Sequence, residues 1–189
     1  PKLTSKKTVK VGNANPDWTG GWSNTFRYKN LSLNVLIDTK QGGKIVSFTD
    51  AVLSGYGSTA RTLAGREGGI VFPGVLDSGE RNTKEINAET LWTTLGGRNN
   101  PVGEVFVYDA SFIRLKEISL SYSFPKSVLG KLPFTGLSLG IYGKNLCYLQ
   151  NKAGIFDPEM TVGTGNNQAL EAFALPSTHS FGINLNVSF

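Results

Sequence analysis

The last nine residues of the sequence alternate strictly between apolar and small or polar side chains. The apolar positions are Phe181, Ile183, Leu185, Val187 and Phe189. A period of two predicts a β-strand with one apolar and one polar face. In a soluble domain the terminal residues are usually poorly ordered, so a regular amphipathic strand is rarely found there. In a membrane β-barrel, by contrast, the last strand must pair with its neighbours to close the wall. We therefore predict a strand over 178–189 whose five apolar residues serve barrel closure and assembly.

Four earlier segments show the same alternation, and we predict strands over 17–28, 31–41, 111–124 and 136–148. A tight turn at Lys29-Asn30 joins the first two strands into a hairpin. In the third strand Arg114 and Lys116 fall on the apolar parity. If that strand crosses a membrane, its beginning is expected to project above the hydrocarbon.

The connections between these strands alternate in length. Those at 29–30 and 125–135 are short, and those at 42–109 and 149–177 are long and polar. Short turns on one side and long loops on the other are typical of outer-membrane barrels. Within the longer loop, 44–48 is expected to extend the second strand and 50–53 to start one helical turn, and the rest is expected to lack regular structure.

Composition and aromatic placement agree with this layout. The 23 glycines, 17% charged and 39% hydrophobic residues fit alternating strands joined by loops. Aromatic residues gather at the short-turn ends, as in an interfacial girdle: Phe26, Tyr28, Tyr122, Phe124 and Phe189. Five amphipathic strands cannot close around a polar lumen, and open edges are not stable in lipid. We expect residues 1–189 to be the C-terminal portion of a larger barrel, or one piece of a split one.

Several ordered motifs resemble one family, the SusC/RagA-type TonB-linked outer-membrane transporters of Bacteroidetes. The motifs run through nearly the whole chain: 11–21, 24–29, 42–45, 109–122, 143–146, the Phe156-Asp157-Pro158-Glu159 run and the terminal strand. The resemblance implies an all-β fold, with this chain forming the C-terminal antiparallel strands of a transmembrane barrel of about 22 strands with long extracellular loops.

The resemblance also implies a function and a set of partners. The whole protein would be a TonB-dependent active importer of oligomeric nutrients, glycans or peptides, in the outer membrane of a Gram-negative bacterium. Its partners would be membrane lipid, the remaining barrel and plug, a SusD-like surface lipoprotein, the TonB system acting through the plug, and an oligosaccharide or peptide ligand. It would be no enzyme and would need no cofactor. Because the chain holds only strands and loops, it could not transport alone.

Other function classes find little support. The net charge of +5 comes from scattered basic residues apart from Lys6, Lys7 and Lys10, so nucleic-acid binding is not expected. The single Cys147 excludes an internal disulfide framework and a multi-cysteine metal site. No apolar run is long enough for a transmembrane helix. The first residues show no apolar leader, so we expect a removed leader or a start within a longer protein.

No catalytic, cofactor or metal site is predicted. His179 is the only histidine and has no chemical partner nearby in the sequence. Asp157 and Glu159 supply too few oxygens for calcium, and a turn around Pro158 is the simpler interpretation. The run 163–165 lacks the helix and lysine of a phosphate-binding loop.

Aromatic side chains stand among amides and arginines in the two long loops. Tyr56, Trp92 and Phe173 are the candidates for contact with a ligand or a lid protein, with Phe72 and Phe106 nearby in the sequence. Loop self-packing is the competing explanation.

Two other architectures remain open at this point. A secreted, soluble β-sandwich that binds carbohydrate would also alternate and would explain the loop aromatics. Its weakness is the long glycine-rich loop, which is uncommon in a compact domain. A small passive porin assembled from several copies is the third alternative, in which each copy donates strands.

Overall fold

The computed structural model describes residues 10–99, 101–130, 133 and 135–189. Lys6, Lys7 and part of the expected short connection at 125–135 lie outside these ranges. The chain folds into two compact units. Unit 1 comprises 1–14, 44–108 and 161–174, and unit 2 comprises 15–43, 109–160 and 175–189. No helix in the described ranges is long and apolar enough to cross a membrane.

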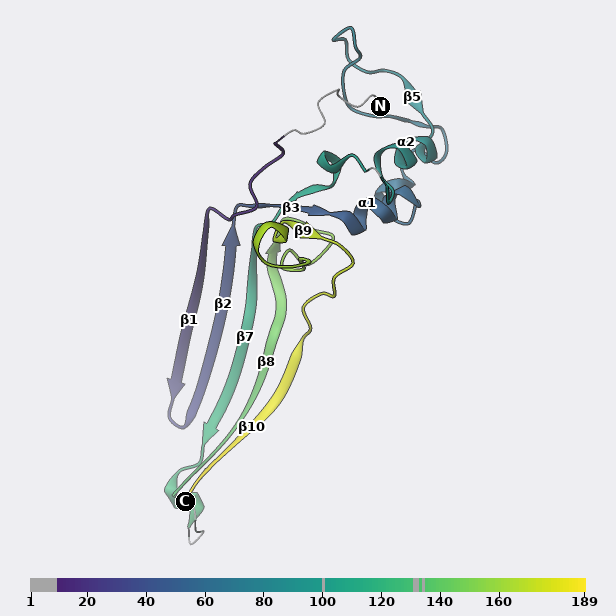
Figure 1. The fold of residues 1–189 in the computed structure, drawn as a ribbon. Coiled ribbons are helices and arrows are strands. Elements are labelled where there is room, and N and C mark those ends of the chain that lie inside the picture. The colour runs from purple at the N-terminus through teal and green to yellow at the C-terminus, as the bar shows by residue number, and fades with distance from the viewer. Residues whose placement is uncertain (1–9, 100, 131–132, 134) are drawn as a thin grey trace. The chain divides into compact units, whose positions relative to one another are not determined.

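Unit 2 is a five-stranded antiparallel sheet in the order β1-β2-β7-β8-β10 (Figure 1). Its strands are β1 (Trp18–Tyr28), β2 (Leu31–Gln41), β7 (Phe112–Ser123), β8 (Gly136–Asn151) and β10 (Ser180–Ser188). All five predicted strands are present, and β8 continues three residues beyond its predicted end. The short helix α3 (Lys126–Leu129) follows β7. Each neighbour along the sheet is also the next long strand along the chain, as in a meander.

Glycine marks the point where the chain leaves this sheet. Gly42 and Gly43, directly after β2, have φ angles of 78° and 82°. A Cβ atom on Gly42 would lie 2.2 Å from a carboxylate oxygen of Asp17. The turn therefore needs glycine both for its left-handed backbone and for its close approach to the start of β1.

Unit 1 is not the structureless loop that the sequence predicts. It contains α1 (Phe48–Gly55) and α2 (Ala88–Leu95), with the 3-10 turns η1 (Ala60–Leu63), η2 (Gly103–Phe106) and η3 (Gly165–Asn167). The short strands are β3 (Lys44–Ser47), β4 (Ile70–Val71), β5 (Glu85–Ile86), β6 (Val107–Asp109) and β9 (Leu170–Glu171). They form one sheet in the order β6-β3-β9, with β3 and β9 parallel, and a β4-β5 pair. The expected extension of the second strand over 44–48 is therefore wrong, because 44–47 forms β3, which lies between β6 and β9 in a separate sheet.

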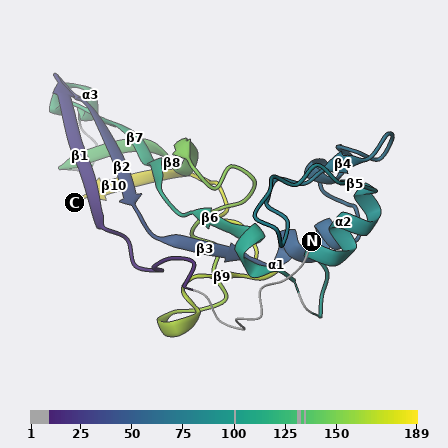
Figure 2. The same cartoon turned by 90° about the horizontal axis from the view of Figure 1, so that it is seen from above.

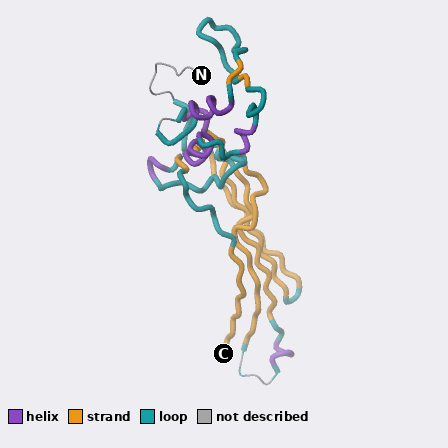
Figure 3. Tube along the Cα trace, turned by 90° about the vertical axis from the view of Figure 1, so that its right-hand side faces the viewer, coloured by secondary structure: helices purple, strands orange, loops and turns teal. Residues whose placement is uncertain are grey.

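Side-chain caps and a small core explain why these short helices form. The Ser47 hydroxyl accepts the Asp50 N–H at the start of α1, and the Asn87 side chain accepts the Glu89 N–H at the start of α2. Ala88, Leu91, Trp92 and Leu95 make a buried cluster on α2. Figure 2 labels α1, α2 and α3, and Figure 3 distinguishes helices in purple from strands in orange along the chain.

Candidate functional site

The strand register brings the alternating apolar residues of unit 2 onto one face of the sheet, here called the apolar face. Directly paired residues share a face. Phe181, Ile183, Leu185 and Val187 of β10 pair with Gly143, Ile141, Leu139 and Leu137 of β8, and across the sheet Ile118 and Leu120 of β7 pair with Val35 and Leu33 of β2. The apolar parity predicted for each strand therefore converges on a single continuous surface.

The apolar face is uncovered in the described chain. Phe181 is 76% exposed, Ile183 74% and Leu185 63%. A continuous apolar surface across five strands is far larger than the scattered exposed apolar residues of a soluble monomer. This face therefore requires an apolar surrounding.

The strands have the length of membrane-crossing strands. β1 and β2 have 11 residues each and β10 has 9, and a tilted strand needs about 9–11 residues to cross a bilayer. Exposed aromatic residues stand near both ends of β1, with Trp18 at one end and Tyr28 at the other. Tyr122 packs edge-to-face on Phe124 at the hairpin end, with ring centroids 5.1 Å apart. Aromatic residues at both ends match the interfacial belts of membrane barrels.

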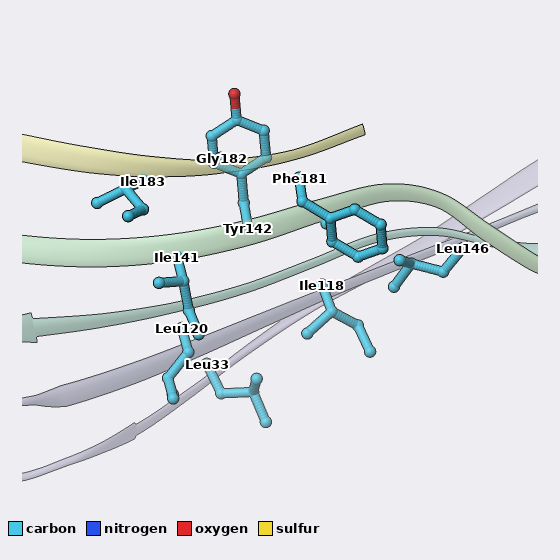
Figure 4. A pocket seen from close by; sticks show the side chains of 10 residues that line it. Leu33, Ile118, Leu120, Ile141, Tyr142, Leu146, Phe181, Gly182 and Ile183 are labelled. Atoms are coloured by element: carbon cyan, nitrogen blue, oxygen red, sulfur yellow. The ribbon is translucent and has the colours of Figure 1, made fainter. Parts of the chain in front are cut away.

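A shallow groove of about 870 Å³ lies on the apolar face (Figure 4). Its lining includes Leu33, Ile118, Leu120, Ile141, Phe181 and Ile183. Gly143 makes room for this packing, since a Cβ atom there would lie 2.8 Å from the Leu146 side chain and 3.1 Å from the Phe181 ring. The groove is almost wholly apolar in its residue types, so it suits hydrocarbon and not a hydrogen-bonding ligand.

The opposite face of the sheet is polar. Ser32, Asn34, Ser119, Ser121, Ser138, Asn184 and Asn186 occupy its paired positions. Tyr142 points away from Ile141 and lies over Gly182 (Figure 4), where a Cβ atom would be 2.5 Å from the ring. The sheet therefore has one face for an apolar medium and one face for a wet interior.

A β-bulge corrects the expectation that Arg114 and Lys116 share the apolar parity. The β2–β7 register shifts so that Leu36 pairs with Glu117 and Ile37 pairs with Leu115, which leaves Lys116 as the extra residue. An extra residue reverses the parity of everything before it. Arg114 therefore pairs with Asp38 on the polar face.

Arg114 is a nearly buried residue at the centre of an ion-pair network. It is 4% exposed, and its Nε and Nη2 donate to the two Asp38 carboxylate oxygens at 3.2 and 2.8 Å. Its Nη1 lies 2.5 Å from Glu159, and its guanidinium carbon lies 5.5 and 5.7 Å from the ring centroids of Phe112 and Tyr148. Bidentate pairing combined with aromatic contact is a strong and geometrically selective use of arginine.

Asp157 fixes the loop that follows β8. Its carboxylate accepts hydrogen bonds from the Tyr148 hydroxyl at 2.6 Å and from the Ser177 hydroxyl and N–H at 2.5 and 3.0 Å. It also accepts from the Glu159 N–H at 2.9 Å. Burial alone would raise the pKa of Asp157, but these hydrogen bonds outweigh it and hold the pKa below its ordinary value. The Asp157–Glu159 run is thus the predicted turn, and it also ties the loop to β7, β8 and the approach to β10.

Trp92 is a core residue of unit 1, which corrects the expectation that it stands in an open loop. It lies on α2 and is 7% exposed. The Arg61 guanidinium lies 4.8 Å from its ring centroid. Its indole N–H is buried without a hydrogen-bond partner among the described residues. Self-packing accounts for most of the ring, but Trp92 also lines a cavity of unit 1, so its contact with a ligand or lid protein stays a prediction.

Arg61 also connects three parts of unit 1. Its Nη1 donates to Asp50 at 2.7 Å and to the Tyr108 hydroxyl at 2.9 Å, and that hydroxyl donates to Asp50. Burial and the neighbouring Asp50 carboxylate raise the pKa of Tyr108. The hydroxyl therefore stays protonated and serves as a donor at neutral pH.

Tyr56 and Phe173, the other two aromatic candidates, are exposed in unit 1. Tyr56 is 74% exposed and caps the end of α1. Phe173 packs edge-to-face on Phe48, and its N–H donates to Thr49. Thr49 and Ser47 each donate to the fully buried Glu171 at 2.5 Å. Both rings are accessible, and their contact with a ligand or lid protein stays a prediction.

The remaining sequence candidates form no chemical centre. His179 shares a hydrogen bond with the Asn145 carbonyl, and Cys147 is an exposed free thiol in β8. Among the described residues, no group of three or more His, Cys, Asp or Glu side chains is placed to hold a metal ion.

Known proteins similar in sequence are TonB-dependent receptors, although no family model matches the chain. The chain is 29% identical over 185 residues to TonB-dependent receptor P3 of Formosa agariphila, and 27% identical over 182 residues to receptor P39 of the same organism. Each alignment covers 95% of this chain and 17% of the relative. The chain therefore spans about a sixth of the length of these relatives.

Solved structures with the same fold are those of the RagAB peptide importer. The open-open state matches with a TM-score of 0.66 at 22% identity, and the closed-closed state with 0.65 at 21%. Each match covers 98% of this chain and 19% of the other. The predicted resemblance to TonB-linked outer-membrane transporters is confirmed, as is the prediction of antiparallel strands of a large β-barrel.

Proposed function

We propose that this chain forms part of the wall of a TonB-dependent importer in the outer membrane of a Gram-negative bacterium. The exposed apolar face of unit 2 carries the proposal. It spans strands of membrane-crossing length, and exposed aromatic residues stand near both of its ends. In this account the apolar face contacts lipid and the polar face contacts the barrel interior.

The two edges of the sheet require further strands. β1 and β10 each pair on one side only among the described strands. An unpaired edge exposes backbone N–H and C=O groups, which is costly in hydrocarbon. Other strands of the same barrel therefore pair with both edges. The apolar side chains of β10, including Phe181 and Leu185, serve closure and assembly of the wall in this account.

The proposed cargo is an oligomeric nutrient, a glycan or a peptide. The similar sequences are TonB-dependent receptors, and the similar structures are of a peptide importer. Energy would come from TonB through a plug carried by another part of the protein, and a SusD-like surface lipoprotein would cover the cargo. The transporter would need no catalytic residues and no cofactor, because the cargo crosses unchanged.

The soluble β-sandwich alternative fits the structure poorly. A sandwich buries the inner face of each sheet against a second sheet. The apolar side chains of β10 are instead mostly exposed, as Ile183 shows. This alternative would therefore leave the most apolar surface of the sheet in water.

Uptake by cells that carry the intact transporter tests the proposal. Labelled oligopeptides and oligosaccharides should enter TonB-proficient cells and not cells that lack TonB. The intact protein should fractionate with the outer membrane and change its gel mobility on heating. Uptake that does not depend on TonB, or a protein found in the soluble fraction, would overturn the proposal.

A further inference from the structure

Phe173 combines an exposed aromatic side chain with an unfavourable backbone conformation. It is 59% exposed, and its φ angle is 51°. Glycine adopts this left-handed conformation freely, but the side chain of a bulky residue in it clashes with the backbone. Strained residues of this kind persist only where the surrounding structure holds them, and they gather at functional sites. The contacts around Phe173 therefore decide what its ring can do.

Two short chains of hydrogen bonds end on the buried carboxylate of Glu171. The Phe173 N–H donates to the Thr49 hydroxyl at 2.6 Å, and that hydroxyl donates to Glu171 at 2.5 Å. The Asp50 N–H donates to the Ser47 hydroxyl at 3.0 Å, and that hydroxyl donates to the other Glu171 oxygen at 2.5 Å. Glu171 is 0% exposed, and no Lys or Arg pairs with it in the described part of the chain. Because each hydroxyl already accepts a backbone N–H, its own proton is directed to the carboxylate, and bonds linked in this way strengthen one another.

Glu171 thereby joins the two long loops within unit 1. It lies on β9 and pairs with Ser47 on β3, and Ser47 is also the N-cap of α1. The carboxylate therefore lies beside the positive end of that helix. The Phe173 ring packs edge-to-face on Phe48, with ring centroids 6.2 Å apart. Backbone and ring of Phe173 are thus both fixed to the start of α1.

The polar groups of this network are used up within unit 1. The Thr49 hydroxyl both accepts and donates, the Phe173 N–H is bonded, and both Glu171 oxygens accept. Beside the ring, the network leaves none of these groups free for a ligand. A small-molecule site needs a few placed polar groups to orient its ligand, whereas a fixed aromatic side chain is typical of the centre of a protein–protein interface.

We propose that Phe173 is a preformed docking point for the surface lipoprotein, and that Glu171 is the positioning residue that holds it. This inference rests on the import function proposed above and adds a surface through which the lid attaches. The ring enters an apolar pocket of the lipoprotein. Because the loop is ordered before the partner arrives, docking costs little conformational entropy. The strain at Phe173 is then the cost of presenting a ring where glycine would suit the backbone better.

Phe173→Gly in the purified intact transporter is the decisive variant, because it removes the ring and relieves the left-handed backbone. The probe is the lipoprotein that co-purifies with the transporter, produced without its lipid anchor, and its affinity is measured by biolayer interferometry. Phe173→Gly should weaken binding by at least about thirtyfold, the threshold of a hot-spot residue. Hydrogen exchange over 169–174 should stay close to wild type, because the relieved strain offsets the lost contact with Phe48. Leu63→Ala is the matched control, since Leu63 is 61% exposed in unit 1 and lies outside this network; its affinity should match wild type.

The role of Glu171 is tested separately. Glu171→Ala should speed exchange over 169–174 and weaken lipoprotein binding, while the barrel keeps its heat-modifiable folded form. Glu171→Gln keeps one acceptor oxygen and should lose less of both. Exchange in Glu171→Ala that is as slow as in wild type would overturn the positioning role. If Glu171→Ala fails to assemble, Glu171→Gln decides this role by the same two readouts.

The remaining outcomes separate the docking point from the importer function. Wild-type lipoprotein affinity in Phe173→Gly, or an equal loss in Leu63→Ala, would overturn the docking point. So would a Phe173→Gly transporter that keeps its lipoprotein affinity but no longer binds labelled oligopeptide or oligosaccharide, because the ring would then contact cargo. In each of these cases the proposed function stands if the unmutated transporter still shows TonB-dependent uptake. Uptake by the unmutated transporter that does not depend on TonB would instead mark failure of the proposed function.

Discussion

Replacing Arg114 with methionine should release the loop that follows β8. Arg114 is 4% exposed, and it pairs with both Asp38 and Glu159. Breaking a buried ion pair costs about 3–5 kcal/mol, because the remaining charge is left without its partner. Only the Glu159 pair joins Arg114 to the loop, and the Glu159 side chain is already 40% exposed, so solvent screening lowers the cost for the loop to about 1.4 kcal/mol. At about 1.4 kcal/mol per factor of ten, opening of the loop becomes roughly tenfold more frequent.

Hydrogen exchange on the intact transporter measures this directly. The Glu159 and Ser177 amides donate to the Asp157 carboxylate, so peptides covering 152–160 and 175–179 report the opening. Lys116→Met is the matched control. Lys116 also pairs with Asp38, but its side chain is 46% exposed, and such pairs contribute only about 0–1 kcal/mol. If these peptides exchange as slowly in Arg114→Met as in wild type, Arg114 does not hold the loop. The same conclusion follows if they exchange as fast in Lys116→Met as in Arg114→Met.

Three further predictions use other parts of the structure. Ile183→Arg should destabilise the barrel by about 2–4 kcal/mol, because it places a charge on the lipid-facing side, and should therefore lower the fraction of heat-modifiable folded transporter on gels. Asn184→Arg, on the polar face, should leave that fraction unchanged. Equal loss of the folded form in both variants would contradict a sheet with one apolar and one polar face. The loop order that Asp157 provides should be constant from pH 5 to 8 and weaken below about pH 4, because a carboxyl with a lowered pKa loses its stabilisation as it is protonated; exchange in Asp157→Asn should lack this dependence. Trp92→Ala should cost about 3–5 kcal/mol and expose 44–108 to protease, whereas Trp92→Phe should cost less, because the lost indole N–H has no partner; equal protease sensitivity of both variants would contradict this.

The long strands were predictable because alternation is a local signal. β2 begins and ends at its predicted residues, and β10 lies within its predicted range. The β7 bulge was not predictable in the same way. A bulge appears only in the register with the partner strand, and the sequence shows Arg114 and Lys116 simply as charges on the apolar parity. The sequence did contain one sign of the bulge: the apolar residues Ile113 and Leu115 lie on the opposite parity to the apolar residues that follow them in β7.

Most of the fold of unit 1 could not be predicted from hydrophobic periodicity. Its helices have eight residues each, so they show barely two turns of periodicity. Their stability comes from contacts distant in sequence, such as the bonds from Ser47 and Thr49 to Glu171. The glycines that suggested disorder instead permit close packing: a Cβ atom on Gly55 would lie 2.4 Å from the Gly97 nitrogen. The Asn87 cap was the one local signal for α2.

The most direct test of the lipid-facing sheet is a spin-label scan along β10 in the intact transporter, reconstituted in lipid. Single cysteines are placed from 181 to 188 in a Cys147→Ser background, and collision rates with oxygen and with a water-soluble nickel chelate are measured. If the apolar face contacts lipid, accessibility should follow a period of two, with high oxygen and low nickel accessibility at 181, 183, 185 and 187 and lower oxygen accessibility at the residues between them. High nickel accessibility at the four odd positions, or no alternation along the strand, would contradict it.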